Sequence, residues 1–72
     1  MKNGDVYRYK NNGTEYVVIE QNILGFSRDS SERRMVLFKP LDLTNKQQFV
    51  CEWLLFTEDF EFLYNVWDGR DA

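Results

Sequence analysis

The sequence lacks histidine and has a single cysteine, Cys51, among its 72 residues. Without histidine, the chain cannot build a Ser–His or Cys–His nucleophilic pair or a histidine-ligated metal site. One cysteine can form neither an internal disulfide nor a zinc site, and it is typical of proteins in a reducing compartment. Glycine-rich phosphate-binding loops are also absent from the sequence. We therefore expect a protein that is not an enzyme and has no metal or cofactor.

Long apolar runs are missing as well. No run approaches the roughly 20 residues that span a bilayer, and the first residues lack the apolar segment of a signal peptide, so we expect a cytoplasmic protein. Residues 1–46 hold eight Lys/Arg and six Asp/Glu, whereas residues 47–72 hold one Arg and six Asp/Glu. This acidic second half argues against nucleic-acid binding and favours a partner with a basic surface.

Aromatic residues are abundant, with two Trp, four Tyr and six Phe. They can supply the core of one small domain covering residues 1–72. The run from Phe49 to Phe56 is apolar at every position except Glu52. A short run that is apolar on both faces predicts a buried central strand. Trp53 would then be largely buried in mid-strand, and Trp53→Ala should cost about 3–5 kcal/mol.

The remaining pattern predicts an antiparallel meander. Asn12-Gly13 favours a tight hairpin turn after the first strand, Gly25 a bend or bulge, and Pro40 the end of the third strand. Thr57 is predicted to cap a helical turn over residues 57–60, and residues 68–72 to form a frayed tail. The fold class is therefore all-β, a small five-stranded antiparallel SH3-like barrel with one short helical turn. The expected strands cover residues 5–10, 15–24, 34–39, 48–56 and 61–67.

Short motifs also suggest a family. The stretches at residues 4–10, 16–18, 27–29, 35–38 and 58–60, together with Trp53, resemble a family of short uncharacterised bacterial and phage proteins. Its members typically open Gly-x-Tyr-Arg-His-Tyr-Lys. The resemblance implies a small β-barrel and little about activity. Tyr9 follows Arg8 directly where the family usually has His, and Leu54 follows Trp53 where the family has Arg. If that His or Arg serves a ligand, this chain lacks it.

The C-terminal part is the first candidate for a partner-binding surface. Phe60, Phe62 and Leu63 are expected to supply the core, which leaves Tyr64 and Trp67 as surplus rings of the kind that anchor interfaces. Acidic residues around them would steer the chain toward a basic surface. The alternative is that Trp67 folds back over one end of the barrel. The predicted contacts are Glu58, Asp59, Glu61, Tyr64, Trp67 and Asp68.

The second candidate is a basic loop. Arginine side chains beside an aromatic ring can grip a phosphate or nucleotide. The residues concerned are Phe26, Arg28, Arg33 and Arg34. Asp29 and Glu32 lie among them, which favours a solvated polar loop instead.

Cys51, the acidic cluster at residues 58–61 and Glu52 each allow two interpretations. Cys51 is expected to be an inert core residue rather than a reactive thiol. The acids at 58, 59 and 61 could hold Mg²⁺ or Ca²⁺, but a solvated acidic turn fits them better. Glu52 either is buried and paired with Arg8, Lys10 or Lys39, or lies at an edge that faces solvent or a subunit interface.

Two functions remain open from the sequence. The first is a non-catalytic binding module, a phage-type or bacterial accessory protein that binds or inhibits a larger host protein through the acidic and aromatic surface. The second is an oligomeric small-molecule binder, such as a nucleotide sequesterer, that uses the arginine loop. A homodimer or higher oligomer fits either function, because a core this small gains stability from a partner.

Overall fold

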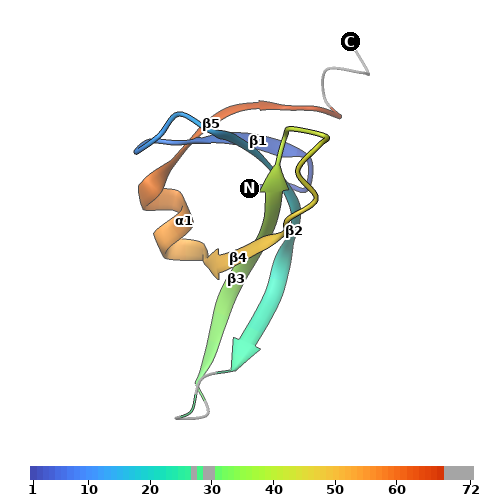
Figure 1. Ribbon diagram of the computed structural model, residues 1–72. Helices are drawn as coiled ribbons and strands as arrows, with labels where there is room; N and C mark the ends of the chain where they lie inside the picture. Colours follow the sequence, from blue (N-terminus) through green and yellow to red (C-terminus); the bar gives the residue numbers. More distant parts are fainter. Residues whose placement is uncertain (27, 29–30, 68–72) are drawn as a thin grey trace.

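The computed structural model describes residues 1–26, 28 and 31–67 of the chain, and its strands form one antiparallel sheet with the order β4-β3-β2-β1-β5. The prediction of a small all-β fold with five antiparallel strands and a single short helix is confirmed. The sheet curls, so that the helix lies between the two edge strands (Figure 1). The elements are β1 (Asp5–Tyr9), β2 (Glu15–Phe26), β3 (Glu32–Pro40), β4 (Phe49–Glu52), α1 (Trp53–Asp59) and β5 (Phe60–Asn65).

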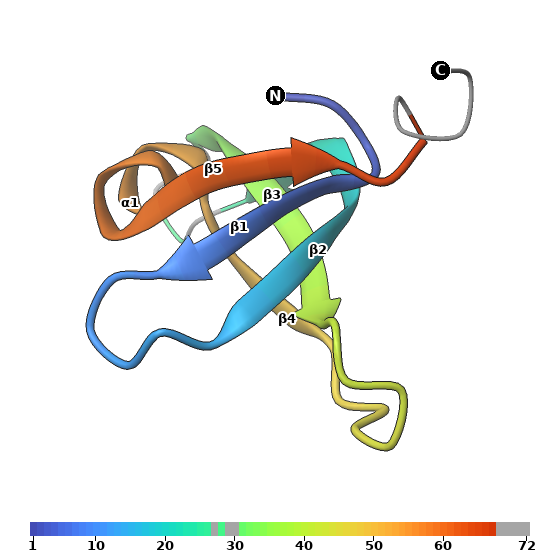
Figure 2. The same ribbon diagram turned by 90° about the horizontal axis from the view of Figure 1, so that it is seen from above.

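The first hairpin follows the local sequence closely. Gly13 has a φ of 75°, the left-handed conformation that Asn-Gly turns favour. The Gly13 amide donates to the Tyr9 carbonyl at 2.8 Å, and β1 then pairs antiparallel with β2. Figure 2 shows β5, β1 and β2 side by side, with α1 at the end where β5 begins.

The second hairpin is longer than predicted. β3 begins at Glu32, two residues before the expected start at residue 34, so Arg33 lies on the strand and not in the expected loop. Gly25 lies within β2, and the register shifts fall between Val18 and Glu20 and between Glu20 and Ile23 instead. The polar residues from Glu32 to Arg34, which suggested a loop, are tolerated in β3 because each of them pairs with a residue of β2. The ends of β2 and β3 project from the rest of the fold (Figure 1).

The run from Phe49 to Phe56 is not a central strand. β4 ends at Glu52, lies at the edge of the sheet and pairs only with β3 among the described strands. The chain continues as α1, which turns Phe56 into the core while Leu54 and Leu55 remain exposed. The composition of a short apolar run fits a strand and a helix equally well. In this fold, packing makes the first half of the run a strand and the second half part of a helix.

The predicted helical turn at residues 57–60 is wrong in position. The helix starts four residues earlier, after Glu52, and the first turn contains no acidic residue. Thr57 is not the cap, because its hydroxyl donates to the Leu54 carbonyl at 2.9 Å within the helix. Phe60, the last residue of the predicted turn, begins β5.

The core lies between α1 and the inner face of the sheet. Its buried members are Val18, Val36, Phe38 and Phe56. The ring of Phe56 stacks on Phe60 with 4.2 Å between centroids and lies 5.0 Å from the ring of Phe38. Trp53 is only half-buried and packs against this cluster from the start of the helix, so the prediction of a largely buried mid-strand Trp53 is wrong. Within the described residues, no helix has the length and apolar character needed to cross a membrane.

Candidate functional site

Three aromatic side chains on β5 and just after it are largely solvent-accessible, whereas Phe60 at the start of β5 packs against the core. The exposed fractions are 55% for Phe62, 46% for Tyr64 and 53% for Trp67. The surplus of Tyr64 and Trp67 at the surface was expected, but the assignment of Phe62 to the core is wrong. Phe62 instead rests against Tyr7 on the neighbouring strand, with ring centroids 5.6 Å apart. Asp68, the last predicted contact, lies outside the described residues.

The acidic side chains before and within β5 have basic neighbours on the first hairpin. Arg8 on β1 forms an ion pair with Glu61, which lies opposite it in the sheet. The Lys10 ammonium donates to the Glu58 carbonyl at 2.9 Å. About fifty residues of chain separate these cations from the acids, so the sequence gives no sign of the contacts. Strand pairing therefore partly neutralises the acidic surface.

The predicted contacts do not form one compact cluster. Glu58 and Asp59 end α1, whereas Trp67 follows the other end of β5. A strand of six residues spans about 20 Å, so an interface must cover the length of β5 to include both ends. Phe62 and Tyr64 lie between these ends and form its middle.

Trp67 is both packed and exposed. A Cβ atom at Gly4 would lie 2.9 Å from the Trp67 ring, which shows how closely the ring covers this glycine. The Trp67 amide donates to Asn65 Oδ1 at 2.8 Å, and Asn65 Nδ2 donates to the buried Asp5 carboxylate at 2.8 Å. One side of the ring therefore covers the end of the sheet, as the alternative reading proposed, and the rest faces solvent.

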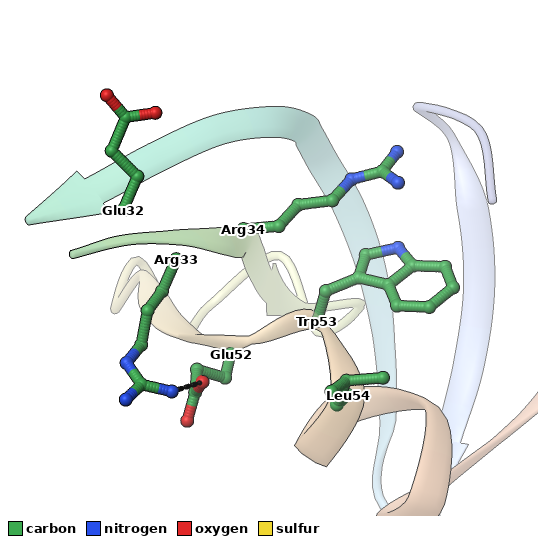
Figure 3. Close-up of a pocket in the computed structure, with 6 residues that line it drawn as sticks. All are labelled: Glu32, Arg33, Arg34, Glu52, Trp53 and Leu54. Carbon is green, nitrogen blue, oxygen red and sulfur yellow. Dashed lines mark hydrogen bonds and ion pairs between the residues drawn. The ribbon is translucent and has the colours of Figure 1, made fainter.

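The second candidate site lies where the β2–β3 hairpin leaves the body of the fold (Figure 3). The Arg34 guanidinium lies 5.0 Å from the centre of the Trp53 ring, a cation–π contact, and it donates to Gln21 Oε1 at 2.8 Å. Arg33 points the other way and pairs with Glu52 at 3.0 Å. Phe26 and Arg28 are exposed.

Two hollows flank the Arg33–Glu52 pair. The larger, about 230 Å³, is lined by Glu32, Arg33, Arg34, Glu52, Trp53 and Leu54. The smaller, about 170 Å³, is lined by Gly25, Phe26, Arg33, Met35 and Glu52. The buried Trp53 Nε1 beside the larger hollow has no hydrogen-bond acceptor among the described residues. The predicted arginines and Phe26 thus gather around the end of β4, except Arg28, which lines neither hollow.

For Glu52, the sequence predicted one of two possible positions correctly but not the ion-pair partner. Glu52 lies on an edge strand, as one of its two readings proposed. Its partner is Arg33, and not Arg8, Lys10 or Lys39. Both side chains of the pair are partly exposed, so the ion pair contributes no more than about 1 kcal/mol to the free energy of unfolding.

Cys51 is half-buried and packs against the core cluster. Burial raises the pKa of its thiol above the ordinary value, and the nearby Asp59 and Glu52 carboxylates raise it further. A thiol that resists ionisation is a poor nucleophile. The described residues also contain no group of three or more His, Cys, Asp or Glu side chains arranged to hold a metal ion.

Comparison of the chain with protein-family models, with curated proteins and with solved structures gave no match. The resemblance to the family of short bacterial and phage proteins therefore stays a prediction.

Proposed function

We propose that this chain is a non-catalytic binding module that docks on a larger protein through the exposed aromatic side chains along β5. The observation that carries the proposal is the balance of apolar residues. Among the described residues, five hydrophobic side chains are buried, whereas eleven large hydrophobic ones are exposed. Three of the eleven, Phe62, Tyr64 and Trp67, lie on β5 or just after it, and exposed apolar side chains of this size are common in interaction sites. An accessory protein of bacterial or phage type that binds or inhibits a host protein fits this surface.

The middle of the surface has the composition of an interface. Phe62 and Tyr64 are exposed rings on β5, and the exposed ring of Trp67 lies two residues after its end. Tyrosine and tryptophan are common binding anchors, because they offer large area and lose little conformational entropy on binding. Arg8 and Lys10 offset part of the acidity at one end. We therefore assign the affinity to the rings and only a steering role to Glu58 and Asp59.

The experiment compares two matched variants. Phe62→Ser combined with Tyr64→Ser removes the proposed anchors, and Leu43→Ser removes an apolar side chain that is 89% exposed in the loop before β4. After capture of a partner from lysate and its purification, we expect the double variant to bind at least about tenfold more weakly, with Leu43→Ser unchanged. Equal affinity of wild type and a folded double variant would contradict the proposal.

The second candidate function is a small-molecule binder at the arginine site. The hollow of about 230 Å³ beside Arg34 and Trp53 favours it, since a ring and a guanidinium can hold a base and a phosphate. However, small-molecule pockets usually measure about 300–1,000 Å³. Glu32 and Glu52 line the same hollow and would repel an anion. This geometry gives weaker support than the exposed rings do.

A nucleotide panel read by thermal shift tests this second candidate. Binding at the arginine site predicts a rise in melting temperature that Arg33→Ala and Arg34→Ala abolish. No shift with any nucleotide at millimolar concentration would reject it.

A further inference from the structure

Two Asn-Gly dipeptides, Asn3-Gly4 and Asn12-Gly13, lie in different surroundings. Asparagine is a chemically labile residue, because the backbone nitrogen of the next residue can attack its side-chain amide carbon and displace ammonia. Glycine in the next position favours this attack, since it has no Cβ to shield the nitrogen and its backbone rotates freely. The other asparagines of the chain all precede residues with a side chain. The two Asn-Gly pairs are therefore the candidates for this modification.

Asn12 lies in the exposed turn between β1 and β2. A Cβ atom at Gly13 would meet nothing within 4 Å, so the reacting groups have room to move. The Thr14 amide donates to Asn12 Oδ1 at 2.9 Å, which polarises the carbonyl that is attacked. The Gly13 amide donates to the Tyr9 carbonyl at 2.8 Å, and this bond must open before the nitrogen reacts. Both hydrogen bonds lie within the turn, so local opening of residues 9–14 is sufficient.

Asn3 is held by contacts with distant parts of the chain. Its Oδ1 accepts a hydrogen bond from the Gln21 amide at 3.2 Å, and the Gly4 amide donates to the Val18 carbonyl at 2.8 Å. Gly4 is buried, and a Cβ atom there would lie 2.9 Å from the Trp67 ring. Attack by the Gly4 nitrogen therefore requires the N-terminal segment to separate from β2 and from Trp67. Opening on this scale costs more free energy than opening of an exposed turn.

We propose that Asn12 is a site of spontaneous deamidation in the folded protein and that the fold protects Asn3 from the same reaction. The Gly13 nitrogen loses its proton and bonds to Asn12 Cγ. The Cγ–Nδ2 bond then breaks, and ammonia leaves with a proton, which closes a succinimide ring. Water adds to either carbonyl of the ring and opens it to an aspartyl or an isoaspartyl residue. The net reaction consumes water and releases ammonia.

The modification changes the first hairpin. Either product adds a carboxylate to a chain with net charge −3. Asp-Gly favours the same tight turn as Asn-Gly, so the aspartyl product keeps the pairing of β1 with β2. The isoaspartyl product adds a carbon to the backbone of the turn and disturbs the bond from the Tyr9 amide to the Thr14 carbonyl, which is 2.8 Å long. The site is separate from the rings on β5, so it does not depend on the proposed binding function.

The test compares the two asparagines in one sample. The full chain is incubated in mildly alkaline buffer, digested at acid pH, where the reaction is slow, and analysed by mass spectrometry for conversion at each site. We expect Asn12 to convert at least about tenfold faster than Asn3 in the folded protein, and both to convert at similar rates in guanidinium chloride. Equal rates in the folded protein would overturn the proposal, as would an Asn12 that reacts only in denaturant. A tenfold difference that persists in denaturant would show that the fold does not protect Asn3.

A pair of variants tests the protection separately. Trp67→Ala uncovers Gly4 and should speed conversion of Asn3 at least about threefold, with the rate at Asn12 unchanged as the internal control. Leu43→Ala, in an exposed loop, should leave both rates as in wild type. Circular dichroism establishes that each variant is folded, and the comparison in denaturant needs no variant. An unchanged rate at Asn3 in folded Trp67→Ala would contradict the assigned protection.

Discussion

Trp53 and Phe56 exchange the roles that the sequence suggests for them. In a strand, Trp53 would share a face with Phe49, Cys51 and Leu55 and fill the core. In the helix, Phe56 takes that place and is fully buried between Phe38 and Phe60. Trp53 moves to the rim, where it supports Arg34. The same aromatic content thus serves the core and a surface site at once.

The residue most sensitive to truncation should therefore be Phe56. Phe56→Ala removes a fully buried ring and is expected to lower the free energy of unfolding by about 3–5 kcal/mol, most of what a small domain has. Leu55→Ala, on the exposed side of the same helix, should change it by less than about 1 kcal/mol. Urea denaturation followed by circular dichroism measures both. Similar losses for the two variants would show that α1 does not face the core as described.

Cys51 gives a pH-dependent prediction. Its pKa is raised in the folded state by burial and by the Asp59 and Glu52 charges, so the folded protein holds the thiol proton more tightly than the unfolded chain does. This contribution to stability is complete below the ordinary thiol pKa of about 8.5 and is lost as pH rises through the folded value. Thermal unfolding between pH 7 and 10 should show a steeper decline for wild type than for Cys51→Ala. Parallel curves would contradict the raised pKa.

At the scale of elements, the first hairpin is the part that sequence reasoning predicts best. Asn12-Gly13 specifies its turn locally, and the alternation of β1 needs no knowledge of the rest of the chain. The change from β4 to α1 at Trp53 could not be read in the same way, because seven apolar residues in eight give no period that separates strand from helix. Only the position of Phe56 against Phe38 and Phe60 decides it.

Gly4 and Gly13 allow a matched comparison of two elements. Both have positive φ, 88° and 75°, so alanine strains the backbone at either position. At Gly13 the new methyl group meets open space, whereas at Gly4 it would lie 2.9 Å from the Trp67 ring. Gly4→Ala should therefore be the more destabilising change and should alter the tryptophan fluorescence, with Gly13→Ala as its control. Equal destabilisation and unchanged fluorescence would show that Trp67 does not cover Gly4.

On the scale of the whole molecule, the curled sheet brings together charged and aromatic side chains that lie far apart in the sequence. The sequence identified the exposed Tyr64 and Trp67 and the arginines of the second hairpin, because unusual residue types in a short chain are visible without structure. It could not show that Arg8 and Lys10 lie beside the acids of the last elements. Nor could it show that Trp53 and Glu52 join the arginines, since these contacts depend on where β4 ends.

The central claim is that the strand ends at Glu52 and the helix begins at Trp53, since this turn buries Phe56 and leaves Trp53 beside Arg34. Backbone NMR chemical shifts over residues 49–60 test it most directly. We expect strand-type Cα and carbonyl shifts from Phe49 to Glu52, helix-type shifts from Trp53 to Asp59, and a return to strand values at Phe60. Strand-type shifts that continue from Phe49 through Phe56 would contradict the account.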